Sequence, residues 1–209
     1  MAAAPRKRLA PEQRRAEILD AATRLIVQQG YLPLPLEQLG RAAGISKALI
    51  YTYFPTQYDL FNALLGRELQ GLIAGGVDTA SRLGNLDEAG LCCAMLYFDH
   101  VAQTGPLLHI LMTDMYMAGH VAAQHTQSLQ KLLRRFYRLA GNALPLTKQE
   151  IMAATEMMAA IPEEAGGLAY HQELELSVAR QLCHSLISSS LQALRAPLAT
   201  LDVRADDLA

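Results

Sequence analysis

Residues 36–54 of the chain read LEQLGRAAGISKALIYTYF, which is the pattern of two short helices joined by a tight turn. Gly40 stands where the two helices would cross closely, so a larger side chain there would push them apart. Gly44 stands at the turn, where a positive φ is usually needed, and Ser46 follows as the N-cap of the second helix. The stretch therefore predicts a helix-turn-helix, a motif whose second helix can enter the major groove of DNA.

Helical signals continue on both sides of this motif. A helix is expected to start at Pro11, a residue suited to the first helical position, and to end at Gly30. The connector at residues 31–35 reads YLPLP and is expected to be stiff, because each proline disfavours helix at the residue before it. A long helix should start after Thr56, its N-cap, and continue to about Ala74.

The remainder of the chain keeps the helical rhythm and carries no strand signal. Residues 147–150, TKQE, fit a capping box, and Pro162 should kink or end the helix that follows. We therefore expect an all-α fold of about nine helices. Its expected parts are a helix-turn-helix domain, a second helical domain and two flexible tails, at residues 10–55, 56–196, 1–9 and 197–209.

The composition is that of a folded globular protein. Hydrophobic residues make up 51% of the 209 residues, which argues against a disordered chain. No apolar run reaches the ~18 residues of a membrane span, and the basic N-terminus lacks the apolar segment of a signal peptide. Cys92, Cys93 and Cys183 match neither a disulfide framework nor a metal-ligand pattern. We expect a cytoplasmic protein without a cofactor.

Positive charge is concentrated in the first part of the chain. Residues 1–60 carry eight Lys and Arg against five acids, a balance of +3, whereas the remainder carries ten against fifteen, a balance of −5. This division suggests that only the first part meets phosphate. We expect Arg41 and the tail residues Arg6, Lys7 and Arg8 to add phosphate or minor-groove contacts. The alternative is a basic tail that only aids solubility.

A set of residues at characteristic spacing runs through positions 15–64, namely Ile18-Leu19, Ala21-Ala22, Gly30-Tyr31, Ala42–Lys47, Tyr51, Tyr53-Phe54 and Asp59-Leu60. Through these residues the stretch resembles the DNA-binding domain of the TetR family of bacterial transcriptional regulators. The resemblance implies an Ω-shaped homodimer, in which each protomer has a three-helix DNA-binding domain and a six-helix domain for ligand binding and dimerisation. It also implies a repressor that leaves its operator when a small molecule binds.

Two positions depart from the pattern of this family. A Thr or Ser commonly opens the second helix and binds a phosphate, whereas Leu34, Pro35 and Leu36 occupy that stretch here. A Lys is common soon after the recognition helix, where this chain has Gln57 and Tyr58. The chain therefore has fewer cations for phosphate than is usual, and the tail arginines are expected to compensate.

The second helix of the motif, residues 46–54, is expected to read DNA. Ile50, Tyr53 and Phe54 would face the core, so that the opposite side remains for DNA. By the resemblance, Lys47 and Tyr51 would hold phosphates, and small or apolar neighbours would approach base edges. The predicted DNA-binding residues are Arg41, Ser46, Lys47, Ala48, Leu49, Tyr51, Thr52 and Tyr53. Packing is the alternative role for Tyr51 and Leu49.

Methionine is the compositional oddity of the second part. Seven of the eight methionines lie between Met95 and Met158, and flexible thioethers suit a pocket that adapts to an apolar ligand. Ordinary core filling is the alternative. No His pair with a carboxylate at helical spacing supports a metal site. The predicted ligand-pocket residues are Met95, Phe98, His109, Met112, Tyr116, Tyr137, Met152 and Met158.

The last two predicted helices are apolar and contain small residues, which suits a four-helix interface between two copies of the chain. A palindromic operator would follow from such a two-fold. Burial within one protomer is the alternative. The predicted interface residues are Thr155, Ala159, Leu174, Val178, Leu182, Ser185, Leu186 and Ser189.

Two other classes of function are the alternatives to a transcriptional regulator. An enzyme is not expected, because the sequence has no nucleophile elbow, no phosphate-binding loop and no carboxylate pair beside a His. A helical ligand- or partner-binding protein with weak or lost DNA binding remains the alternative to a ligand-responsive repressor. The expected partners are a double-stranded DNA operator, a small, largely apolar effector and a second copy of the chain, with no membrane.

Overall fold

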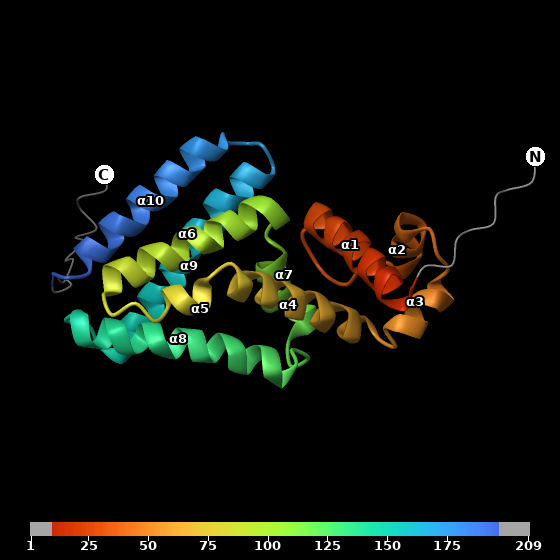
Figure 1. The fold of residues 1–209 in the computed structure, drawn as a ribbon, viewed down its shortest axis with the longest axis horizontal. Helices are drawn as coiled ribbons and strands as arrows, with labels where there is room; N and C mark the ends of the chain where they lie inside the picture. Colours follow the sequence, from red (N-terminus) through yellow and green to blue (C-terminus); the bar gives the residue numbers. More distant parts are fainter. Residues whose placement is uncertain (1–9, 197–209) are drawn as a thin grey trace, which may run out of the picture. The chain divides into compact units, whose positions relative to one another are not determined.

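The structure is a computed structural model that describes residues 10–196, and the predicted tails at 1–9 and 197–209, with Arg6, Lys7 and Arg8, lie outside these residues. The described part contains α-helices and one short 3₁₀ helix and no strand, so the predicted all-α fold is confirmed (Figure 1). The elements are α1 Pro11–Gln29, α2 Leu36–Ala43, α3 Lys47–Tyr53, α4 Gln57–Ala74, α5 Val77–Ala80, α6 Leu86–Thr104, α7 Leu107–Thr113, η1 Met115–Met117, α8 Ala123–Ala143, α9 Lys148–Tyr170 and α10 Leu176–Ala193.

The structure adds two features to the predicted helices. The short α5 and η1 were not foreseen, because a single turn has no measurable periodicity. Of the two outcomes predicted at Pro162, a kink or an end of the helix, the end is excluded, because α9 continues through this buried residue. A proline inside a helix removes one backbone hydrogen bond, and packing of α9 along α10 offsets that loss.

The described chain divides into two compact units. The first comprises residues 10–75 and 103–129, and the second comprises residues 76–102 and 130–196. In the first unit α4, α7 and η1 accompany the three helices of the predicted DNA-binding domain. Where the DNA-reading part of the chain ends functionally, at residue 55 or later, stays a prediction.

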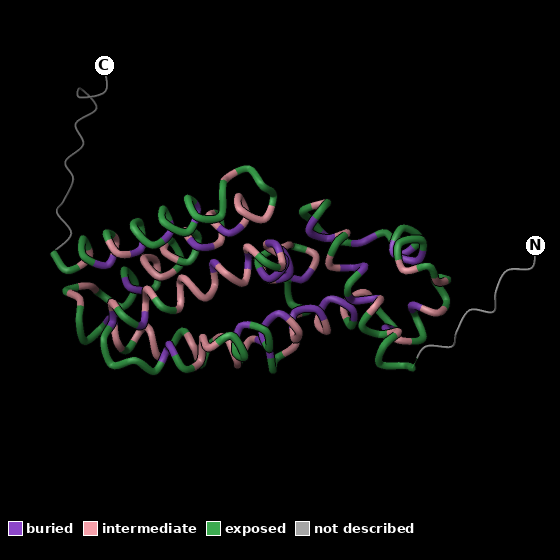
Figure 2. The backbone as a smooth tube through the Cα atoms, turned by 45° about the horizontal axis from the view of Figure 1, so that its top comes forward, coloured by how far each residue is buried: buried purple, intermediate pink, exposed green. Residues whose placement is uncertain are grey.

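The first unit is built around α1, α4 and α7. The helix α4 begins with the predicted N-cap, since the Thr56 hydroxyl accepts from the Asp59 N–H and the Asp59 carboxylate accepts from the Thr56 N–H. Helix α7 packs against both α1 and α4. Buried residues recur along these three helices (Figure 2). They are Ile18, Ala22, Ile26, Leu60, Phe61, Leu64, Leu65, Leu107 and Leu111.

Helices α2 and α3 form the predicted helix-turn-helix. A Cβ atom added at Gly40 would lie 2.8 Å from the carbonyl oxygen of Ile45, so the predicted close crossing is confirmed. Gly44 ends α2 with a φ of 65°, a conformation that favours glycine. The Ser46 Oγ accepts a hydrogen bond of 3.2 Å from the Leu49 N–H and caps α3. Each of the three residues thus has the role expected from the sequence.

The second unit is held together by α6, α9 and α10. Its α9 begins with the predicted capping box between Thr147 and Glu150. A Cβ atom added at Gly166 on α9 would lie 2.7 Å from the Val101 Cβ on α6, so the two backbones approach closely there. The buried core consists of Leu86, Phe98, Ala140, Ile151, Ala179, Cys183, Ile187 and Leu191.

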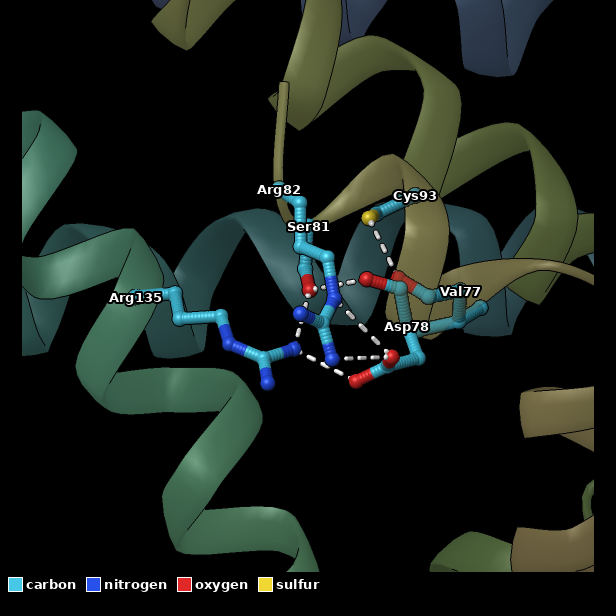
Figure 3. Close-up of polar contacts among 6 residues, drawn as sticks. All are labelled: Val77, Asp78, Ser81, Arg82, Cys93 and Arg135. Atoms are coloured by element: carbon cyan, nitrogen blue, oxygen red, sulfur yellow. Dashed lines mark hydrogen bonds and ion pairs between the residues drawn. The ribbon is translucent and has the colours of Figure 1, made fainter. Parts of the chain in front are cut away.

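A polar cluster joins α5 to α8 in the second unit (Figure 3). The Arg135 guanidinium donates to the Asp78 carboxylate and, at 2.9 Å, to the Ser81 hydroxyl. Arg82 donates to the other Asp78 oxygen at 2.9 and 3.1 Å. The hydrogen bond from Arg135, which is the larger cause, and those from Arg82 hold the pKa of Asp78 below its usual value of 3.8. The cluster fixes the short α5, which has only one turn of its own.

Replacing Gly40 by Ala should lower the free energy of unfolding by about 1–3 kcal/mol, because the new Cβ meets a backbone oxygen that cannot move without opening the turn. Chemical denaturation measures this change. Gly167→Ala is the matched control, since Gly167 is also helical and has open space around an added Cβ. An unchanged stability of Gly40→Ala would contradict the close crossing.

Replacing Arg135 by Gln should lower the Tm at pH 7. The pKa of Asp78 is lower in the folded protein than in the unfolded chain. The ionised Asp78 carboxylate therefore stabilises the fold above its unfolded-state pKa, and this stabilisation is lost as the pH falls through its folded-state pKa. The difference in Tm between variant and wild type should therefore narrow as the pH falls from neutral towards 3.8 and below. Arg134→Gln is the control, because Arg134 bonds only Gln130 on its own helix. A difference that is constant with pH would refute this linkage.

Candidate nucleic-acid interface

The helix α3 is held by its inner side. Ile50 and Phe54 are 1% and 2% exposed, as the sequence predicted. The Arg15 guanidinium of α1 lies 5.0 Å from the centre of the Phe54 ring, which adds a cation–π contact to the apolar packing. With its inner face fixed, α3 has one orientation in the first unit, and its opposite face stays outside.

The outer face of α3 carries the side chains predicted to contact DNA. Lys47, Ala48, Tyr51 and Thr52 are exposed, whereas Leu49 and Tyr53 are half-buried. The predicted division of this helix into an inner and an outer side is therefore confirmed. On the preceding helix Arg41 is exposed as well, and Ser46 is exposed while its oxygen caps α3. Contact of these eight residues with DNA stays a prediction.

Thr52 has a definite hydrogen-bonding polarity. Its hydroxyl donates to the Ala48 carbonyl at 3.1 Å, one turn back along α3. The hydroxyl hydrogen of Thr52 is thus engaged in this bond, and the hydroxyl oxygen can act only as an acceptor on the outer face. An acceptor at this position matches the exposed amino group of adenine or cytosine in the major groove.

An ion pair between α2 and α3 was not predicted. The Lys47 Nζ lies 2.6 Å from the Glu37 Oε1, and both side chains are largely exposed. The hydrogen bond between them lowers the pKa of Glu37 and raises the pKa of Lys47. The two residues are ten positions apart and lie on different helices, so only the geometry of the turn brings them together. Lys47 therefore has a carboxylate partner in the free protein.

The predicted ligand-pocket residues fall in both units. In the second unit Phe98 is fully buried, with Met95, Tyr137 and Met158 packed against its core cluster, and Met152 is 39% exposed. The structure thus brings four of the eight residues together around one apolar core. Of the remaining four, Met152 is exposed on the second unit, and His109, Met112 and Tyr116 belong to the first unit.

The predicted dimer residues lie on α9 and α10, which pack together. On α10 one side is buried within the unit, at Ala179, Cys183 and Ile187. The opposite side is exposed although much of it is apolar. The predicted residues exposed on this side are Val178, Leu182, Ser185, Leu186 and Ser189.

The predicted residues of α9 are less uniform. Ala159 is exposed and Thr155 is half-buried, and Leu174, just before α10, packs against the core. Met157, which is not among the predicted residues, is 71% exposed on the same helix. Sequence periodicity did not reveal this exposure, because it does not show which of two apolar sides is covered.

Within residues 10–196, none of the helices has both the length and the apolar character needed to span a membrane. No group of three or more His, Cys, Asp or Glu side chains in this range is arranged to hold a metal ion. The cysteines Cys92, Cys93 and Cys183 are free thiols.

Comparison with known proteins bears on the same residues. The family model of the bacterial regulatory proteins of the tetR family matches residues 18–64, which span α1 to α4. The transcriptional activator FasR of Mycolicibacterium smegmatis is 29% identical over 119 residues, which cover 56% of this chain and 54% of FasR. The transcriptional repressor KstR of Rhodococcus jostii is 27% identical over 146 residues, which cover 69% of this chain and 68% of KstR.

Solved structures share the fold over most of the chain. A TetR-like transcriptional regulator from Rhodococcus sp. RHA1 has a TM-score of 0.65 and 21% identity, covering 88% of this chain and 99% of its own. The transcriptional regulator FadR from Bacillus subtilis, solved in complex with stearoyl-CoA, has a TM-score of 0.56 and 16% identity, covering 84% and 98%. The relatives named are transcriptional regulators, and none of them is an enzyme. With the capped helix-turn-helix described above, these matches identify residues 18–64 as a DNA-binding domain of the tetR family of bacterial regulatory proteins.

Proposed function

We propose that this protein is a ligand-responsive, DNA-binding repressor that a small, largely apolar effector releases from a palindromic operator. The observation that carries this proposal is the outer face of α3. Lys47, Ala48, Tyr51 and Thr52 are exposed there while Ile50 and Phe54 fix the opposite face. A helix presented in this way by a helix-turn-helix is suited to the major groove.

The outer face divides into positioning and reading groups. Lys47 and Tyr51 contact phosphates, which sets the register of the protein on the duplex. Ala48, Leu49 and Thr52 approach base edges, where apolar groups meet thymine methyls and the Thr52 oxygen accepts from an amino group. Arg41, Ser46 and Tyr53 add contacts at the border of this surface.

The Glu37–Lys47 pair shapes how Lys47 meets DNA. To hold a phosphate, the Lys47 ammonium exchanges the Glu37 carboxylate at 2.6 Å for another anion. The pair is solvent-exposed, so this exchange costs little. The carboxylate also remains beside the DNA backbone and repels phosphate, which makes binding by this helix depend on the other contacts.

The exposed apolar side of α10 supports a homodimer. Val178, Leu182 and Leu186 recur at the i, i+4, i+8 spacing of one helix face, and each is at least 40% exposed. Ser185 and Ser189 lie on the same exposed side and allow a close approach. We propose that a second copy covers this side together with Thr155 and Ala159, which gives the two-fold that a palindromic operator requires.

The effector site is proposed for the apolar region around Phe98. Met95 and Met158, with flexible thioethers, and Tyr137, with a polar hydroxyl, pack on the same core. Met152 lies in the same unit, whereas the other predicted residues, His109, Met112 and Tyr116, belong to the first unit. An effector that prefers the conformation with lower DNA affinity shifts the equilibrium by a coupling of about 1–3 kcal/mol.

An electrophoretic shift on the DNA upstream of the protein's own gene tests DNA binding. Lys47→Ala should weaken binding and reduce the slope of log K against log salt by about 0.9, the share of one phosphate contact. Lys148→Ala removes the same charge from an exposed position at the start of α9 and should leave the slope unchanged. If wild-type protein binds no DNA at low salt, with or without effector, the proposal fails and the helical ligand- or partner-binding protein replaces it.

Leu182→Glu should weaken dimerisation at least about tenfold, because a charge would be buried in the interface. Sedimentation at several protein concentrations measures the dissociation constant. Leu133→Glu is the control, since Leu133 is an exposed leucine on α8 outside the proposed interface. Equal dissociation constants for both variants and wild type would exclude the α10 face as the interface.

A further inference from the structure

The connector between α1 and α2 has few backbone donors. Residues 31–35 read YLPLP, and the two prolines carry no N–H. Tyr31 is exposed, whereas Leu32 and Leu34 are only 6% and 0% exposed. A buried N–H without a partner is costly, so the hydrogen bonds of Leu32 and Leu34 decide whether this connector can hold its conformation.

Both of these N–H groups are bonded to side chains outside the three-helix domain. The Leu32 N–H donates to the Asp114 Oδ2 at 2.8 Å, and the Leu34 N–H donates to the Gln57 Oε1 at 3.1 Å. Asp114 lies between α7 and η1, and Gln57 is the first residue of α4. The carbonyl groups of the connector are held differently, since the Gln29 amide of α1 donates to the carbonyls of Tyr31 and Pro33.

Asp114 is itself fixed on its other side. Its Oδ1 accepts from the Tyr116 N–H at 2.8 Å and thereby caps η1. The Tyr116 ring stacks on the Tyr58 ring with centroids 5.0 Å apart and meets the Phe61 ring edge-on at 5.9 Å. Tyr58 and Phe61 belong to α4, as does Gln57. The connector, Asp114, η1 and the start of α4 thus form a closed ring of contacts.

We propose that Asp114 is a positioning residue for DNA reading. Together with Gln57 it fixes the connector from which α2 starts, and it thereby sets the orientation of the helix-turn-helix on the first unit. A displacement of the segment between α7 and η1 would pass through this carboxylate to α2 and α3. This role rests on the proposed function, and it assigns to DNA binding a residue 60 positions beyond the recognition helix.

The sign of the effect separates positioning from simple electrostatics. Asp114 is an anion in the unit that carries the DNA-binding helix, so removing its charge should by itself strengthen binding to phosphate. If Asp114 instead holds the connector in place, its removal should weaken DNA binding. Asp114→Ala leaves two backbone donors without a partner, and Asp114→Asn keeps one acceptor oxygen for two donors.

The experiment measures operator affinity by fluorescence anisotropy on the full chain, with Tm as a check of folding. Asp114→Ala should bind at least about fivefold more weakly than wild type, and Asp114→Asn should lie between them. Thr113→Ala is the matched control, because the Thr113 hydroxyl bonds only the His109 carbonyl of its own helix, and its affinity should not change. Unchanged or stronger binding by both Asp114 variants would overturn the proposal.

Hydrogen exchange of the Leu32 amide gives a second readout that does not need DNA. Exchange should become faster in Asp114→Ala and Asp114→Asn and stay unchanged in Thr113→Ala, whereas unchanged exchange in all three would overturn the role of Asp114. Gln57→Ala should accelerate exchange at Leu34 and also weaken binding, and Gln57→Glu, which keeps an acceptor, should protect Leu34 again. If wild-type protein binds no DNA, the proposed function fails, while exchange at Leu32 still tests the anchoring by Asp114.

Discussion

The burial of Ile50 and Phe54 is the contact on which the DNA-reading arrangement depends. Full burial of side chains of this size contributes about 1.5–3 kcal/mol each, and both are almost completely removed from solvent. Because the two residues lie four apart on one face of α3, their burial fixes the rotation of the helix. The exposed positions of Lys47, Ala48, Tyr51 and Thr52 follow from that rotation. The rotation of α3 therefore decides which side chains form its exposed surface.

Backbone hydrogen bonding imposes the second constraint. The connector before α2 has two prolines, so it cannot satisfy its polar groups by helix formation. The N–H groups of Leu32 and Leu34 instead donate to the side chains of Asp114 and Gln57, respectively. These two residues are distant in sequence but lie in the same unit. The stiffness expected from the prolines is therefore only part of the explanation. The connector is held in place from outside, by residues of α4 and of the segment after α7.

Prediction from sequence succeeded where local chemistry decides the structure. The caps at Ser46, Thr56 and Thr147 were readable because an N-cap needs a particular side chain at a particular spacing. Periodicity likewise placed Ile50 inside and Lys47 outside. Prediction missed α5 and η1, whose single turns show no periodicity. At Pro162 the sequence left a kink or an end of the helix open, and the structure excludes the end. The Glu37–Lys47 pair was missed because it depends on how the turn folds back.

The sequence by itself determined the all-α class, the helix-turn-helix and the inner and outer sides of α3, because helical period, capping and glycine conformation act over a few residues. Only the tertiary structure decided which apolar sides are covered, so that Val178, Leu182 and Leu186 are exposed while Cys183 and Ile187 are buried. It also decided which distant side chains accept hydrogen bonds from the N–H groups of the connector. Contacts between residues far apart in the chain are set by the packing of whole helices, and no local pattern encodes the partner of a single N–H.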